Sequence, residues 1–196
     1  MNICLAGWYF HKPLLDVLQG SKYEYFVVSH KPGFGNKVIP NVGLEFGCYD
    51  WYLENEWKGG MVLFFHDDNE VTERALDEIA KLTPDQCYLF SSEDEAKANG
   101  YCHGRAMVCS ERFLIRLKAD GGFWYDEGNH GNIDPTTAEG PNYHNAGIQT
   151  FRAYLNLLPK DQFRVSRYAF VPGMRLAYRG RISDVADVVK KPVKKV

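Results

Sequence analysis

A cluster of ionisable side chains directly follows an apolar run in the stretch MVLFFHDDNEV, residues 61–71. The cluster comprises His66, Asp67, Asp68, Asn69 and Glu70. Carboxylates this close together repel one another unless a proton, a cation or open water lies between them. The cluster therefore suggests a site for a hard divalent cation such as Mg²⁺ or Mn²⁺, which would in turn hold phosphate oxygens.

A helix cap is the second interpretation of the same residues. Apolar residues recur at helical spacing just after the cluster, at Val71, Ala75, Ile79 and Leu82. Acidic side chains are favoured at the start of a helix, where free N–H groups and the helix dipole attract negative charge. The residues alone leave both interpretations open.

The first half of the chain alternates predicted strands with predicted helices. Strands are expected at 2–8, 23–30, 59–65 and 86–90, and helices at 12–20, at 43–57 and from Val71 onward. Residues 31–41 are predicted to be a loop because of their proline and glycine content. This alternation predicts an α/β fold with a mostly parallel sheet covered by helices on both faces. Ligands of such sheets bind beyond the carboxyl ends of the strands, where the acidic cluster is expected.

The second half is predicted to be less regular. Residues 104–122 suggest a strand followed by a helix that is capped near Ser110 and stopped by Gly121. Residues 123–143 are predicted to be a long Gly- and Asn-rich loop, for which a functional role is expected. A helix is predicted at 144–159, and edge strands carrying several arginines at 163–182. We expect one domain over 1–185 and a basic tail or linker over 186–196.

The composition is that of an ordinary globular protein. The chain has 196 residues, 45% of them hydrophobic, and a net charge of -2, which gives no bulk attraction to nucleic acid or to anionic membranes. Its five cysteines show no CxxC spacing and are predicted to be reduced thiols. No stretch is long and apolar enough to suggest a membrane span or a signal peptide, which predicts a cytoplasmic location.

Three segments together resemble the GT-A nucleotide-sugar glycosyltransferases. The strand MVLFF followed by acidic residues resembles their D-x-D motif, although Asn69 stands where a second aspartate would follow Asp67. The segment IPNVGLEFGCYDWYL resembles their Asn-x-Gly segment and the helix after it. GRAMVCSERFLIRLKADGGFWYDEGN resembles their acceptor-side strand, helix and acidic loop. The resemblance covers most of residues 1–155, and either Asp67 with Asn69 or Asp68 with Glu70 fits the motif.

The resemblance implies a GT-A-like (Rossmann-like) domain with a small, antiparallel and loop-rich acceptor side. It implies transfer of a sugar from a UDP- or GDP-sugar to a hydroxyl of a glycan or other acceptor, with Mn²⁺ or Mg²⁺ on the diphosphate. The implied metal ligands are Asp67, Asp68, Asn69, Glu70 and His144. The implied nucleotide-sugar contacts are Gly7, Trp8, Tyr9, His30, Asn41, Asp67 and Asp68.

Asp126 or Glu127 is the implied general base, and an inverting displacement follows from such a base. His130 is a candidate acceptor contact. The arginines at 164, 167, 175, 179 and 181 are candidate diphosphate clamps or a solvated strand face. Several of the other candidates also have structural interpretations: ring packing for Trp8 and Tyr9, a surface position for His30, and a helix cap for Asn41.

Two other functions remain open from the sequence. A metal-dependent phosphohydrolase or nuclease could use the same acidic cluster, and it would hydrolyse nucleotide without an acceptor. A binding module could hold a sugar nucleotide or a glycan without turnover. An oligomer is also possible, because the acceptor half is small.

Overall fold

The computed structural model of the chain describes residues 1–41, 43–82, 86–89, 106–123, 164–166, 174–178 and 181–184. The helices are α1 (Lys12–Gly20), α2 (Leu44–Asn55), α3 (Glu73–Ala80) and α5 (Glu111–Ala119). The strands are β1 (Asn2–Gly7), β2 (Tyr25–Ser29), β3 (Lys37–Val38), β4 (Val62–His66), β5 (Glu70–Val71), β6 (Gln86–Leu89), β7 (Ala106–Cys109), β8 (Arg164–Ser166), β9 (Met174–Tyr178) and β10 (Arg181–Asp184).

Seven of these strands form one sheet in the order β3-β2-β1-β4-β7-β6-β8. Neighbours from β3 to β4 are parallel, as are β6 and β8, whereas β7 is antiparallel to both β4 and β6. A second sheet has the order β10-β9-β5, with antiparallel pairing. The predicted α/β fold with a mostly parallel sheet is confirmed.

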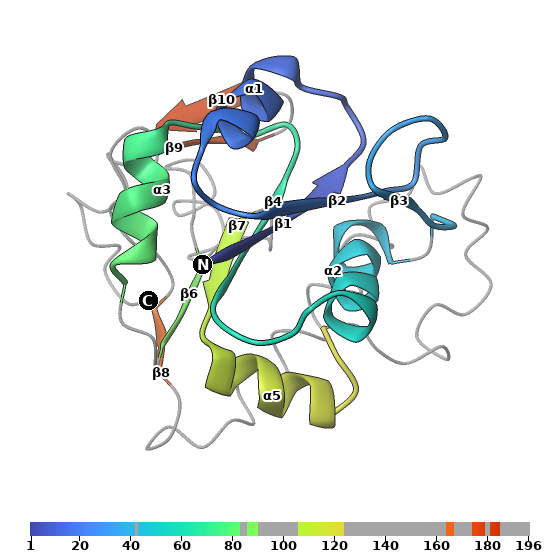
Figure 1. Cartoon of the computed structure of the whole chain (residues 1–196), viewed down its shortest axis with the longest axis vertical. Helices are drawn as coiled ribbons and strands as arrows, with labels where there is room; N and C mark the ends of the chain where they lie inside the picture. The colour runs from blue at the N-terminus through green and yellow to red at the C-terminus, as the bar shows by residue number, and fades with distance from the viewer. Residues whose placement is uncertain are drawn as a thin grey trace.

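Helices cover both faces of the large sheet, as predicted. Alternate residues of β1 face opposite ways: Ile3 and Leu5 pack with residues of α1 and α3, while Cys4 and Ala6 pack with residues of α2 and α5. Figure 1 shows α1 and α3 on one side of the sheet and α2 and α5 on the other. The central strands β1 and β4 are therefore buried on both faces.

Two predicted boundaries are wrong, in both cases because pairing with another strand overrides the local pattern. The predicted loop 31–41 contains β3, which extends the sheet: the Ile39 N–H donates to the Ser29 carbonyl at 2.9 Å. Glu70 and Val71 were expected at a helix start, but they form β5 and pair with Arg175 and Met174 of β9.

The helix caps resolve two of the open interpretations. Thr72 caps α3, its hydroxyl accepting from the Ala75 N–H at 3.2 Å, so the interpretation of the acidic cluster as a cap is wrong. Gly43 is the N-cap of α2 with a φ of 81°, so the same interpretation of Asn41 is also wrong. The predicted cap at Ser110 is confirmed, since its hydroxyl accepts from the Phe113 N–H at 3.2 Å.

Other predictions fall outside the described residues: the long loop after Phe123, the helix at 144–159 and the tail at 186–196. Cys4, Cys48 and Cys109 are buried cysteines with reduced thiols. Among the described helices, none has the length and apolarity needed to cross a bilayer.

Phe64 is expected to be a major source of stability. Its ring lies 5.0 Å from that of Phe123 and 5.1 Å from that of Tyr49, centroid to centroid, and its side chain is fully buried. Phe64→Ala is expected to lower the free energy of unfolding by about 3–5 kcal/mol, because it leaves a cavity. Urea denaturation measures this loss. Ile115→Ala is the control, since Ile115 is 59% exposed on α5, and an equal loss in both variants would contradict the packing described.

Candidate functional site

The carboxyl ends of β1, β2 and β4 lie side by side. Gly7 pairs in register with Ser29, and Ala6 pairs with His66. The segment after β1 therefore meets both His30, which follows β2, and the acidic cluster, which follows β4. The structure thus brings together most of the predicted site residues that it describes.

Asp67 binds the segment after β1. Its Oδ2 accepts backbone N–H bonds from Trp8 at 2.9 Å, Tyr9 at 2.7 Å and Phe10 at 2.8 Å. The Asp67 side chain is fully buried, and its own N–H donates to the Ala6 carbonyl at 3.0 Å. One carboxylate oxygen thus holds three consecutive peptide groups.

These hydrogen bonds offset the strain of the segment that they hold. Phe10 has a φ of 61°, a left-handed conformation that costs a non-glycine residue on the order of 1–3 kcal/mol. Hydrogen bonds to a charged group contribute about 1.5–3 kcal/mol each. Three of them outweigh the backbone strain, and they also satisfy Oδ2, one of the two oxygens of the buried carboxylate.

The rings of this segment project outward. Trp8, Tyr9 and Phe10, here called the aromatic segment, are 42%, 59% and 56% exposed. The Trp8 ring lies 6.3 Å from that of His30 and the Tyr9 ring 5.8 Å from that of His66, centroid to centroid. Phe10 instead packs edge-on against Phe34 at 4.7 Å. Two exposed rings therefore flank the ends of β2 and β4.

His66 and Asp68 form a pair next to Asp67. The Nδ1 atom of His66 lies 3.2 Å from Oδ1 of Asp68 and 3.8 Å from Oδ1 of Asp67. Burial, the largest single influence, lowers the pKa of His66, but the hydrogen bond and charge of Asp68, with the charges of Glu45 and Asp67, outweigh it and raise the pKa. The imidazole therefore sits in a strongly electronegative environment.

His66 and Asp68 also carry donor atoms suited to binding a cation. The second oxygen of Asp67, Oδ1, is buried and finds no hydrogen-bond partner in the described part of the chain. Within the described residues, no group of three or more His, Cys, Asp or Glu side chains is arranged to hold a metal ion. Mg²⁺ sites that include substrate phosphates need only one or two carboxylates from the protein. His66 and Asp68 could provide the protein's share of such a site, and the imidazole would favour Mn²⁺ over Mg²⁺.

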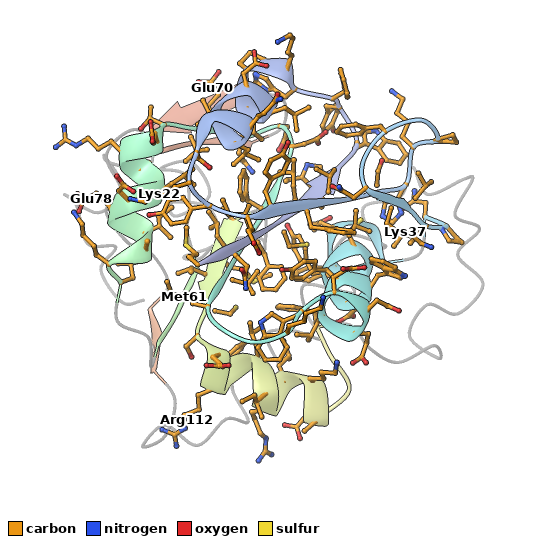
Figure 2. All side chains as sticks on the ribbon, viewed as in Figure 1. Lys22, Lys37, Met61, Glu70, Glu78 and Arg112 are labelled. Carbon is orange, nitrogen blue, oxygen red and sulfur yellow. The ribbon has the colours of Figure 1, made fainter. Side chains whose placement is uncertain are left out.

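The other predicted metal ligands lie in different surroundings. Asn69 is buried, and its side-chain amide donates to the His66 carbonyl at 2.8 Å, which closes the turn after β4. Glu70 belongs to β5 and lies beside α1 (Figure 2). His144 lies outside the described residues. The ligand roles of these residues stay predictions.

A buried thiol lies beside His30. The Sγ atom of Cys48 is 3.3 Å from Nε2 of His30, and Nδ1 of His30 is 3.4 Å from the Ile39 carbonyl oxygen. Burial raises the pKa of the Cys48 thiol, and the charges of Glu45 and Asp67 raise it further, so the thiol stays protonated. The contact with Cys48 therefore orients the His30 ring, and the protonated thiol of Cys48 is not a nucleophile.

Sequence reasoning missed two of these residues: His66 as a ligand candidate and Cys48 beside His30. The available signal for His66 was its place at the end of an apolar strand. Asn41, which was predicted, lies two residues after Ile39, and its buried Oδ1 has no hydrogen-bond partner within the described ranges.

Asp126, Glu127 and His130 lie outside the described residues, as do Arg167 and Arg179. Arg164, Arg175 and Arg181 lie on β8, β9 and β10. A cavity of about 730 Å³ lies between β3 and the α2 face that carries Trp51, and none of the predicted site residues lines it. Lys37, which lines this cavity, lies at the right of Figure 2, away from Glu70 at the upper left.

No protein-family profile matches the chain, and no curated protein matches it. Among solved structures, it is similar to two crystal structures of the glycosyltransferase GlyE of Streptococcus pneumoniae TIGR4. One shares 13% identity with a TM-score of 0.43, and the apo form shares 15% with a TM-score of 0.44. Each match covers 84% of this chain but 44% of the solved chain, so this chain spans less than half of that protein. With likeness this low, function is inferred from the residues of the site.

The pKa of His66 is expected to lie above the ordinary histidine value of about 6.5. Asp68→Asn is expected to lower it, because the substitution removes the charge that is hydrogen-bonded to the ring. Titration of the His66 ring protons by NMR in metal-free protein measures both values. A pKa at the ordinary value, unmoved by Asp68→Asn, would contradict the pairing.

The pairing of His66 with Asp68 also determines whether the fold becomes more or less stable as the pH rises. Because the folded-state pKa is raised, the pair stabilises the fold fully below about pH 6.5, and this contribution is lost as the pH rises through the raised pKa. The wild type is therefore expected to lose its advantage over Asp68→Asn as the pH rises. Urea denaturation in EDTA across this range measures the difference, and an advantage that grows with pH would count against the pairing.

Proposed function

We propose that this chain is a metal-dependent glycosyltransferase that transfers a sugar from a nucleoside-diphosphate sugar to an acceptor hydroxyl, with inversion. The observation that carries the proposal is the convergence at the ends of β1, β2 and β4. There, the exposed Tyr9 ring lies against His66, which is paired with Asp68, and the exposed Trp8 ring lies against His30. Parallel α/β sheets bind ligands at this edge, and a nucleotide needs both an apolar surface and a centre for its phosphates.

His66 and Asp68 would hold the cation through Nδ1 and Oδ1, and the His66 ring must first lose its proton. When bound, Mn²⁺ or Mg²⁺ neutralises charge on the diphosphate leaving group as a Lewis acid. Tyr9, whose ring lies against that of His66, would border the diphosphate. Trp8, beside His30, would offer its face to the base.

The acceptor side of the reaction depends on residues outside the described ranges. Asp126 or Glu127 is proposed to take the proton of the acceptor hydroxyl. His144 is proposed as a further cation ligand and His130 as an acceptor contact. Residues 1–185 are proposed to form the domain, and we propose a cytoplasmic location.

Thermal melting with nucleoside diphosphates and their sugars, in Mn²⁺ and in EDTA, tests the donor site. A ligand at about 100 times its dissociation constant is expected to add about 2.7 kcal/mol of stability, which raises the melting temperature by a few degrees. Asp68→Ala and EDTA are each expected to abolish this rise. Glu78→Ala is the matched control, because Glu78 is a carboxylate on α3 that pairs with Lys81 away from the site (Figure 2).

No rise with any nucleotide, or an equal rise in Asp68→Ala, would exclude the donor site.

If a nucleotide does bind, measurements of turnover distinguish the three candidate functions. Nucleotide hydrolysis without an acceptor would indicate a phosphohydrolase. Nucleotide binding without turnover, unchanged when Asp126 and Glu127 are both replaced by alanine, would indicate a binding module. Acceptor-dependent release of nucleoside diphosphate that these replacements abolish is the result expected of a glycosyltransferase.

A further inference from the structure

Asp67 contacts the proposed nucleotide surface and not the solvent. Its Oδ2 atom receives the three N–H groups of the aromatic segment, and no part of its side chain is exposed. The rings of Trp8 and Tyr9 are exposed, and Phe10 has a left-handed backbone. Without the carboxylate, the segment would lose the three hydrogen bonds that offset the strain at Phe10.

We propose that Asp67 is a positioning residue, whose carboxylate fixes the aromatic segment in the conformation that receives the nucleotide. The inference rests on the proposed function and separates two roles within one motif. His66 and Asp68 pair with each other and hold the cation, while Asp67, between them in sequence, organises the strand-to-helix segment that borders the same ligand.

Removing the carboxylate is expected to reduce nucleotide affinity more than cation affinity. In Asp67→Ala the segment leaves its bound-like conformation. If it then occupies that conformation about a tenth of the time, the apparent nucleotide dissociation constant rises about tenfold. Asp67→Asn keeps one carbonyl oxygen as an acceptor for the segment and is expected to recover part of the loss.

The experiment measures two affinities in each variant. Calorimetry gives the affinity for UDP and GDP in saturating Mn²⁺, and electron paramagnetic resonance gives the affinity for Mn²⁺ without nucleotide. Asp67→Ala is expected to weaken nucleotide binding about tenfold while Mn²⁺ binding changes less than about twofold. His66→Ala is expected to weaken Mn²⁺ binding directly. Thr72→Ala, which loses the α3 cap, controls for a general loss of stability and should leave both affinities unchanged.

A wild type that binds nucleotide while Asp67→Ala binds it equally well would overturn the positioning role. A wild type that binds neither UDP nor GDP would instead overturn the proposed donor site. In that case the amide NMR signals of Trp8, Tyr9 and Phe10 decide the positioning role alone. They are expected to be protected from exchange in the wild type, to lose protection in Asp67→Ala and to regain part of it in Asp67→Asn, and equal protection in the wild type and Asp67→Ala would overturn it. Asp67→Asn serves in all measurements if Asp67→Ala does not fold.

Discussion

The site depends on three hydrogen bonds, which consecutive backbone N–H groups donate to the Asp67 carboxylate. They tie the segment after β1 to the end of β4, two parts of the chain that are almost sixty residues apart. Because the carboxylate is buried, these hydrogen bonds act at low dielectric and are individually strong. They keep Phe10 in a left-handed conformation and leave the rings of Trp8 and Tyr9 exposed beside the two histidines.

That interaction is possible only because β1 and β4 are parallel neighbours. Their register sets Ala6 against His66, so the residue after β4 arrives just where the chain leaves β1. Gly7 contributes at the same point: a β-carbon there would lie 2.6 Å from the Phe34 ring, which in turn packs against Phe10. The register of the sheet therefore determines where the site forms. The end of β4 and the turn after it supply its ionisable side chains, His66, Asp67 and Asp68.

Much of the fold was predictable because the strands carry buried runs and the helices carry recognisable caps and stops, such as Ser110 and Gly121. β3 and β5 were missed because each has two residues and is defined by pairing with another strand, β2 for β3 and the distant β9 for β5. In the site, the local pattern pointed to the acidic cluster but not to the contacts within it, where Asp68 pairs with His66 and Asp67 binds the aromatic segment. Hydrogen bonds between residues far apart in sequence, as between Asp67 and Tyr9, leave no periodic signal in the sequence.

A crystal structure of the chain with Mn²⁺ and the nucleoside diphosphate that gives the largest melting shift would test the central claim most directly. The account predicts anomalous density for Mn²⁺ between the His66 ring, the Asp68 carboxylate and the diphosphate, with Asp67 still bound to the aromatic segment. Density for Mn²⁺ at Asp67 with the segment released from it, or nucleotide in the cavity beside Trp51, would contradict the account.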